Sequence, residues 1–374
     1  MVSVKANRGE WSEPYVALRV LGDGKLYLAG ENGEKLEDTW MDVIEVVRYE
    51  TTNQIIRYKY DPVATSVVIN IDGVEIASML AADFLKIADM LKGEIISSSG
   101  RSFSVSDEIT DFLKTIGIEH MKAKSVDKSD IFLSLFDSRA SVTRNSIGFS
   151  IKSKLGKDPT LFNTASASGP IYKLDGMTDE LMVQINNTLN SKGKVAVSDR
   201  CRIIKDNCGI EFFGYPVAKQ AKCKAFQENL ELLNERLPFV IAEVLKNHFF
   251  NNESDTDIDK VIETVVRENP CKINRPEVRY PFMMKSFLYA SYCGMTASTL
   301  WDGKSNVNGG FITVDEDGEV LAHYALESDS FKEYLYKHCY LEFPSTSSGH
   351  GDYGSVYKEN GEYYFKLNFQ IRYK

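Results

Sequence analysis

An aspartate and a lysine lie on the polar sides of two neighbouring segments whose side chains alternate between apolar and polar. In 130–136 the aliphatic residues fall on one side and Asp130 on the other, and in 147–154 Ser150 and Lys152 fall on the polar side. Such alternation is typical of β-strands with one buried face. The sequence therefore predicts two adjacent strands that offer an acid and a lysine on their polar sides.

This pair of residue types suits the hydrolysis of a phosphodiester. That reaction needs a nucleophilic water and a clamp for the charge on phosphorus; a carboxylate-held Mg²⁺ supplies both, and a nearby lysine can orient the water and stabilise negative charge. The order Asp130, then Ser150, one spacer and Lys152 has the form D…(D/E)-x-K, with serine where a second carboxylate is usual. Ser150 is either a hydrogen-bond partner of a metal-bound water or simply a small strand residue, and by itself the pattern also fits a strand-edge aspartate and a solvated lysine.

The rest of the chain predicts a mixed α/β protein that could hold these strands. Apolar periodicity and turn residues indicate strands at 26–29, 40–49, 55–60 and 67–71, and hairpins at 309–314 with 319–324 and at 355–357 with 363–373. Helical spacing indicates helices at 14–21, 77–91, 107–115 with Ser106 as its cap, 226–249, 257–268 and 281–296.

Composition excludes several classes of protein. The chain has 374 residues, 43% of them hydrophobic, no apolar run near the roughly 18 residues of a membrane span, and no signal-peptide core at its start, so we expect it in the cytoplasm. Its six cysteines and five histidines lack zinc-site spacing. A net charge of −9 disfavours nucleic-acid binding, but 121–225 carries 17 basic and 10 acidic side chains, which permits it.

Six blocks in chain order carry a wider resemblance that covers nearly the whole chain. Together they resemble the HpaII-type family of restriction endonucleases: Asn7-Arg8-Gly9-Glu10-Trp11-Ser12-Glu13, Gly24-Lys25-Leu26-Tyr27, Lys122-Ala123-Lys124-Ser125 with Lys128-Ser129-Asp130-Ile131, Gly148-Phe149-Ser150-Ile151-Lys152-Ser153, Thr160-Leu161-Phe162-Asn163 and Leu367-Asn368-Phe369-Gln370-Ile371-Arg372.

The resemblance implies a type II restriction endonuclease with a PD-(D/E)xK-type core, a mixed central sheet flanked by helices. It implies Mg²⁺-dependent cleavage of both strands of double-stranded DNA at a short site, for which we expect a GC-rich target of the CCGG kind that the family's namesake recognises. A homodimer and a cognate DNA methyltransferase in the same cell are expected with it. We expect 1–225 to form the nuclease core and 226–374 a helical and β-hairpin region for DNA recognition or dimerisation.

With Ser150 in the middle position, another acid has to complete the metal site. The first candidate is Glu10 and the second Glu13, because an acid in the first helix of this fold class can approach the strand of Lys152; Asp127 and Asp158 are lesser candidates. Pro14 is tolerated only in a helix's first turn, which would leave Glu10 on a loop. A helix N-terminal charge stabilised by the dipole is the alternative reading of either glutamate.

Several polar residues are candidates for contacts with DNA. Lys154 shares the side of Lys152 and suits a phosphate contact, and Asn163 follows the catalytic strand and suits adenine edges, unless it is a cap or turn residue. The polar, glycine-rich loop 344–354 could reach DNA or be an ordinary hairpin connection. The other DNA-binding candidates are Lys124, Lys128, Lys157, Ser347 and His350.

Two other functions remain open at this stage. A chain that lost its centre at Ser150 would be a catalytically inactive, sequence-specific DNA-binding protein on the same fold. A repair-type or RNA-directed nuclease on this scaffold would cut according to the structure of its substrate rather than at a fixed sequence.

Overall fold

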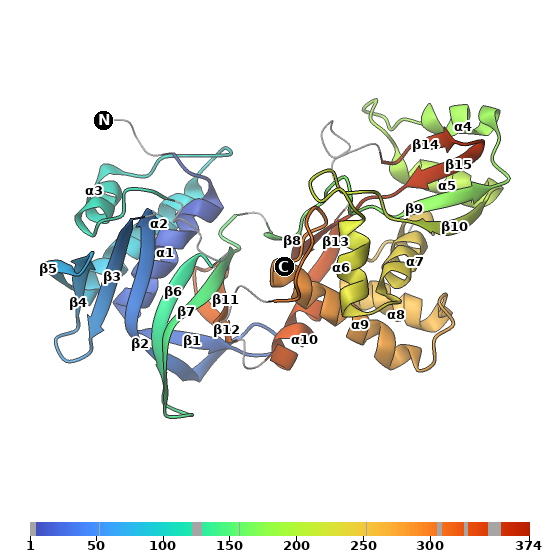
Figure 1. Ribbon diagram of the computed structural model, residues 1–374. Coiled ribbons are helices and arrows are strands. Elements are labelled where there is room, and N and C mark those ends of the chain that lie inside the picture. Colours follow the sequence, from blue (N-terminus) through green and yellow to red (C-terminus); the bar gives the residue numbers. More distant parts are fainter. Residues whose placement is uncertain are drawn as a thin grey trace. The chain divides into compact units, whose positions relative to one another are not determined.

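The structure is a computed structural model that describes residues 5–51, 53–121, 129–156, 158–251, 253–304, 309–324, 328–342 and 353–374. It contains two compact units, of which unit 1 comprises Met1–Pro159 and Ser305–Phe331, and unit 2 comprises Thr160–Lys304 and Lys332–Lys374. Each unit combines helices with sheets (Figure 1). The predicted mixed α/β class is thus confirmed, whereas the division of function at residue 225 stays a prediction.

Unit 1 is built on a nine-stranded mixed sheet in the order β1-β12-β11-β7-β6-β2-β3-β4-β5. The β1/β12 and β7/β11 pairs are parallel and the other neighbours antiparallel, so the predicted mixed central sheet is confirmed. Its strands are β1 (Lys25–Ala29), β2 (Lys35–Thr51), β3 (Gln54–Asp61), β4 (Ser66–Ile71), β5 (Val74–Leu80), β6 (Ile131–Asp137), β7 (Val142–Ser153), β11 (Gly310–Val314) and β12 (Val320–Tyr324).

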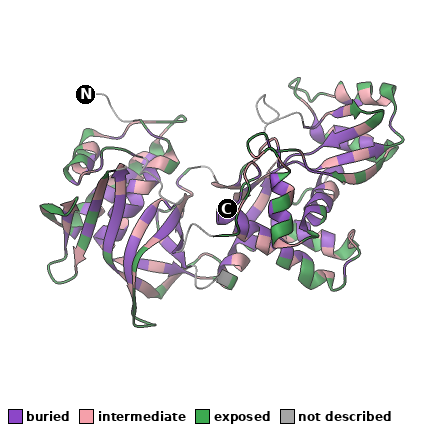
Figure 2. Ribbon diagram, viewed as in Figure 1, coloured by how far each residue is buried: buried purple, intermediate pink, exposed green. Residues whose placement is uncertain are grey.

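The helices of unit 1 are α1 (Arg8–Asp23), α2 (Ala81–Ser97) and α3 (Asp107–Thr115). Ten of the sixteen residues of helix α1 are buried, and Trp11 and Leu18 pack in one core with Ile131 and Leu133 of β6. The aliphatic side of β6 therefore faces this core, which appears as the purple centre of the sheet in Figure 2. Because side chains alternate along a strand, the opposite face is left for Asp130 and its neighbours.

Two helices of unit 1 differ from the prediction. The helix expected at 14–21 begins earlier, at Arg8, and the helix expected at 77–91 is replaced by strand β5 followed by α2. Asn7 caps α1 through its side chain, which moves the start six residues upstream. Helix α3 spans 107–115 as predicted, but Ser106 makes no side-chain capping bond.

Unit 2 holds two smaller sheets, ordered β10-β9-β15-β14 and β13-β16-β8. Their strands are β8 (Thr160–Phe162), β9 (Ile171–Asp175), β10 (Gly209–Gly214), β13 (Cys339–Glu342), β14 (Val356–Glu359), β15 (Glu362–Lys366) and β16 (Gln370–Tyr373). The helices are α4 (Asp179–Asn186), α5 (Val197–Asn207), α6 (Ala225–Leu233), α7 (Leu237–Phe250), α8 (Ile258–Glu268) and α9 (Pro276–Tyr292), and α10 (Ser328–His338) runs from the end of unit 1 into unit 2.

Two elements of unit 2 differ from the prediction. The single helix expected at 226–249 is divided into α6 and α7, because Asn234 adopts an extended backbone and Pro238 occupies the first turn of α7. The strand expected at 363–373 is also divided, since β15 and β16 belong to different sheets. The β14/β15 hairpin around 359–361 is confirmed.

Candidate active site

Asp130 lies one residue before β6 and opposite Ser150 of β7, as the antiparallel pairing of Ile131 with Phe149 requires. Its backbone N–H donates to the Phe149 carbonyl at 2.8 Å and so extends the ladder by one residue. Its Oδ2 accepts hydrogen bonds from the Ile151 backbone N–H at 2.7 Å and from the Ser150 hydroxyl at 3.1 Å. Two donors from the neighbouring strand therefore fix the orientation of this carboxylate.

Gly148 allows the chain just before Asp130 to lie close to β7. A Cβ atom at Gly148 would come within 2.2 Å of the Ser129 hydroxyl oxygen and 2.8 Å of its Cβ. Atoms at such distances overlap strongly, so only glycine fits without a shift of the backbone. Two residues of the block Gly148-Phe149-Ser150 thus position Asp130. Gly148 leaves room for Ser129, and the Ser150 hydroxyl donates to the carboxylate.

Lys152 follows Ser150 by two residues and therefore lies on the same face of β7. On the other side of β7 it is paired with Thr313 of the parallel strand β11. Burial lowers the pKa of Lys152 below its ordinary value, and the negative charge of Asp130 opposes that change. The structure thus brings the predicted acid and lysine into electrostatic contact on one face of the sheet.

Glu10 lies in the first turn of α1, not on a loop as Pro14 suggested. The Asn7 side chain accepts from the Glu10 N–H at 3.0 Å, and Glu10 Oε2 accepts from the Asn7 N–H at 2.8 Å, which forms a capping box. Pro14 sits inside the helix. The same turn approaches the chain beyond β7, because a Cβ at Gly156 would lie 2.6 Å from Cδ of Arg8.

Among the residues that the structure describes, no three histidine, cysteine, aspartate or glutamate side chains gather where they could hold a metal ion. Glu10 and Glu13 are thus not brought together with Asp130 into a three-acid site. Asp158, the other described candidate acid, interacts instead with Lys154. The identity of the second carboxylate stays a prediction.

Lys154 lies just beyond β7, where its N–H donates to the Val314 carbonyl at 2.7 Å. Burial lowers the pKa of its side chain, and the charges of Asp315, Asp158 and Glu316 oppose that change. The lysine expected to contact a phosphate therefore has acidic neighbours in the protein itself. A DNA contact by Lys154 stays a prediction.

Asn163, exposed directly after β8, belongs to unit 2, whereas Asp130 and Lys152 belong to unit 1. Its contact with DNA stays a prediction. The remaining candidates lie outside the described residues and likewise stay predictions: Lys124, Asp127, Lys128, Lys157, Ser347 and His350.

Sequence reasoning missed a buried ion pair that holds the chain before the basic segment 122–128. Arg48 Nε donates to Glu50 Oε2 at 2.7 Å, and Glu50 Oε1 accepts the backbone N–H of Glu119 at 2.8 Å and that of His120. Arg48 also donates to the His120 carbonyl. The signal was available, because Arg48 and Glu50 lie two residues apart and so share one face near the end of strand β2.

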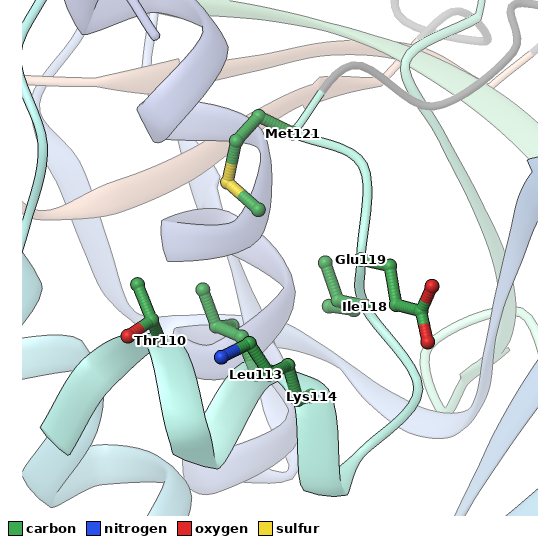
Figure 3. A pocket seen from close by; sticks show the side chains of 6 residues that line it. All are labelled: Thr110, Leu113, Lys114, Ile118, Glu119 and Met121. Carbon is green, nitrogen blue, oxygen red and sulfur yellow. The ribbon is translucent and has the colours of Figure 1, made fainter. Parts of the chain in front are cut away.

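A hollow of about 390 Å³ adjoins the same stretch in unit 1 (Figure 3). Its side chains come from α3 and the segment that follows, and most of its wall is apolar: Thr110, Leu113, Lys114, Ile118, Glu119 and Met121. None of the predicted site residues that the structure describes lines it. The sheet face that carries Asp130 and Lys152 is therefore the better supported place for chemistry.

Comparison with known proteins identifies the class of the chain. Residues 7–373 match a family model of restriction endonucleases, which are enzymes that cut DNA. The chain belongs to the HpaII restriction endonuclease family. It is 34% identical over 370 residues to the type II restriction enzyme HpaII of Haemophilus parainfluenzae, and the alignment covers 98% of each of the two chains. No solved structure matches the chain.

The chain is thus a homologue of a type II restriction endonuclease, as the sequence predicted. Among the described residues, no helix is long and apolar enough to cross a membrane.

Proposed function

We propose that the protein hydrolyses both strands of double-stranded DNA at a short specific site in the presence of Mg²⁺, with Asp130 and Lys152 at its centre on a PD-(D/E)xK-type core. One observation carries the proposal. The charges of Asp130 and Lys152 interact on adjacent strands of a mixed sheet, in a chain that aligns with a type II restriction enzyme over 98% of its length.

The residues around Asp130 fit a magnesium ion. In sites that act on phosphates, Mg²⁺ is usually held by one or two carboxylates, with waters and substrate phosphate oxygens as its other ligands. Asp130 supplies one carboxylate, and the two hydrogen bonds to its Oδ2 leave other lone pairs available. When bound there, the ion would acidify a water and neutralise charge on the phosphate.

The chain's own groups orient the reactants at this face. Ser150 and the Ile151 N–H hold the Asp130 carboxylate in one orientation, so that little rearrangement is needed when substrate arrives. The charge of Lys152 interacts with that of the Asp130 carboxylate, and its amino group can donate to the attacking water and to a phosphate oxygen. Its partly desolvated position strengthens both interactions relative to bulk water.

Replacement of either central residue tests the assignment. We expect Asp130→Asn and Lys152→Ala to lower the rate of plasmid cleavage in Mg²⁺ on the order of 10²-fold or more, while binding of the same DNA in Ca²⁺ stays measurable. Lys86→Ala is a matched control, because this exposed lysine of α2 pairs with Glu108 on the surface. Full cleavage by the Lys152→Ala protein would overturn the assignment.

Glu10 is our candidate for the second carboxylate. Its helical turn lies next to the chain that leaves β7, and glutamine at the same position can maintain a capping box. We therefore expect Glu10→Gln to retain the unfolding temperature and lose cleavage. Glu10→Ala should lose cleavage and also about 1 kcal/mol of stability with the cap. Wild-type cleavage by the Glu10→Gln protein would remove Glu10 from the metal site.

A second candidate function is an inactive, sequence-specific DNA-binding protein, which the serine at position 150 favours. Incubation of the wild-type protein with plasmid DNA and Mg²⁺ separates the two. Discrete fragments support the restriction enzyme, and a mobility shift without fragments supports the binding protein. A nuclease that recognises substrate structure would instead cut branched or damaged DNA without a fixed sequence.

The finer points of the proposal follow from the family. We propose a GC-rich target of the CCGG kind, cut by a homodimer whose two equivalent centres suit a palindrome, in a cytoplasm that also contains a methyltransferase for the same site. We retain 226–374 as the region for recognition or dimerisation. A digest of DNA of known sequence identifies the target, and sedimentation identifies the oligomer.

A further inference from the structure

Unit 2 contains a pocket of about 500 Å³ at the end of its four-stranded sheet. It begins at β9, β14 and β15 and is completed by the segments before β9, after β10 and before β14. Most of its wall is apolar, and the remainder carries amino and hydroxyl groups: Ser166, Ile171, Pro216, Val217, Lys219, Ser355, Tyr357 and Lys366. The polar part of the wall offers hydrogen-bond donors to a ligand.

The charge of this pocket is of one sign. Among the described residues that line it there are two lysines and no carboxylate. Lys366 is only 8% exposed and its amino group donates to the Ser166 carbonyl at 3.4 Å, while Lys219 is exposed at the rim. Hydroxyl groups of Ser166 and Ser355 add neutral donors. Lysines and hydroxyl groups, in a wall whose described residues include no acid, are suited to bind a phosphate.

Two lining residues lie close along the chain to predicted DNA contacts. Ser166 lies three residues after Asn163, and Ser355 follows the glycine-rich loop 344–354. Gly354, the last residue of that loop, is hydrogen-bonded to the backbone of Lys366, because its N–H donates to the Lys366 carbonyl at 2.9 Å. The lining therefore includes residues within three positions of Asn163 and directly after Gly354.

A buried arginine holds this part of the wall in place. Arg200 is 2% exposed, and its Nη1 donates to the Gly354 carbonyl at 2.7 Å and to the Ser355 hydroxyl at 2.9 Å. Its Nε donates to the Thr188 carbonyl at 3.1 Å. With its wall fixed by these bonds, the pocket would lose little conformational freedom when a ligand binds.

We infer that this pocket binds a backbone phosphate of the DNA, through Lys366 and Lys219. The inference rests on the proposed function, since it takes the substrate to be duplex DNA, and it assigns to unit 2 a contact that is independent of base sequence. A second copy of the chain is the other occupant to consider, but the two lysines and the absence of a carboxylate among the described lining residues favour a polyanion.

The salt dependence of binding tests this inference. We expect Lys366→Gln and Lys219→Gln each to reduce the slope of the logarithm of the binding constant against the logarithm of salt concentration by about 0.9, the value for one phosphate contact. Binding is measured in Ca²⁺, on one duplex that carries the target and one that does not. The loss should be equal on both duplexes, because a phosphate contact does not read sequence.

Lys173→Gln is the matched control. Lys173 lies two residues from Ile171 on the same face of β9, but its amino group pairs with Glu362 at 3.1 Å and does not line the pocket. Its slope should equal that of the wild type. Because Lys366 is buried, thermal unfolding is measured for each variant, and the exposed Lys219→Gln variant decides the question if Lys366→Gln does not fold.

The possible results separate this inference from the proposed function. Wild-type slopes in Lys219→Gln and in a folded Lys366→Gln overturn the pocket's role while cleavage by the wild-type protein leaves the function standing. A change in sedimentation at an unchanged slope shows that the face contacts a second copy instead. Stabilisation by inorganic phosphate with no change of slope shows a free anion, which also overturns the inference.

Discussion

Replacement of Ser150 with aspartate would restore the usual D…D-x-K order, and it would set two carboxylates opposite each other on adjacent strands. The Ser150 hydroxyl now lies 3.1 Å from Asp130 Oδ2. Two unit charges about 4 Å apart repel by about 4 kcal/mol at an effective dielectric constant near 20. Because Asp130 is half-buried, part of that repulsion is screened, and we expect Ser150→Asp to be about 2 kcal/mol less stable than the isosteric Ser150→Asn.

The assay is urea denaturation of both variants at pH 7, in EDTA and in excess Ca²⁺. In EDTA the Ser150→Asp protein should unfold at lower urea. A cation that binds between the two carboxylates should offset the difference, since a ligand at 100 times its Kd contributes about 2.7 kcal/mol. Equal stabilities in EDTA would refute the cross-strand geometry, and a difference that Ca²⁺ leaves unchanged would refute cation binding at this face.

The buried pair and the close contact in unit 1 give two further predictions. Glu50→Ala leaves Arg48 without its carboxylate and should cost about 3 to 5 kcal/mol at pH 7, measured by thermal unfolding. Burial would raise the pKa of Glu50, but Arg48 and two backbone N–H groups lower it below 4.5. The difference in unfolding free energy between the variant and the wild type should therefore shrink as pH falls from 4.5 through the folded pKa. A difference that stays constant with pH contradicts the charge pairing. Gly148→Ala should lower the free energy of unfolding by about 1 to 3 kcal/mol. Adding Ser129→Gly to that variant should restore most of the loss, whereas additive losses would contradict the 2.2 Å contact.

The strands that carry the candidate site were predictable because their pattern is local. Alternation in 130–136 and 147–154 places Asp130 and Lys152 on polar sides, and β6 and β7 follow those segments closely. The hydrogen bonds from Ser150 and Ile151 to Asp130 were not predictable, since they depend on register across the hairpin. A shift of one residue would have turned Lys152 to the other face.

Helix boundaries failed where one residue outweighed the periodicity. Pro14 argued for a late start of α1, but Asn7 and Glu10 cap an earlier one, and the buried side chains around Pro14 stabilise the interrupted helix through packing. The segment 77–91 fits helical spacing throughout, yet its first residues pair with β4, which a local pattern cannot report. Contacts distant in sequence, such as that of Glu50 with residues 119 and 120, are invisible for the same reason.

Unit 1 is formed by two segments that are distant in the chain, Met1–Pro159 and Ser305–Phe331, and this affects when its sheet can form during synthesis. The residue paired with Lys152 is Thr313, 161 positions further along the chain. Pairings so distant form late and slowly, and synthesis proceeds from the N-terminus. A nascent chain that ends before β11 exposes the far edge of β7, so the strand of Lys152 gains its second neighbour only after Val314 has been translated. A chain that terminates before β11 therefore lacks the strand that pairs with Lys152 at the proposed centre.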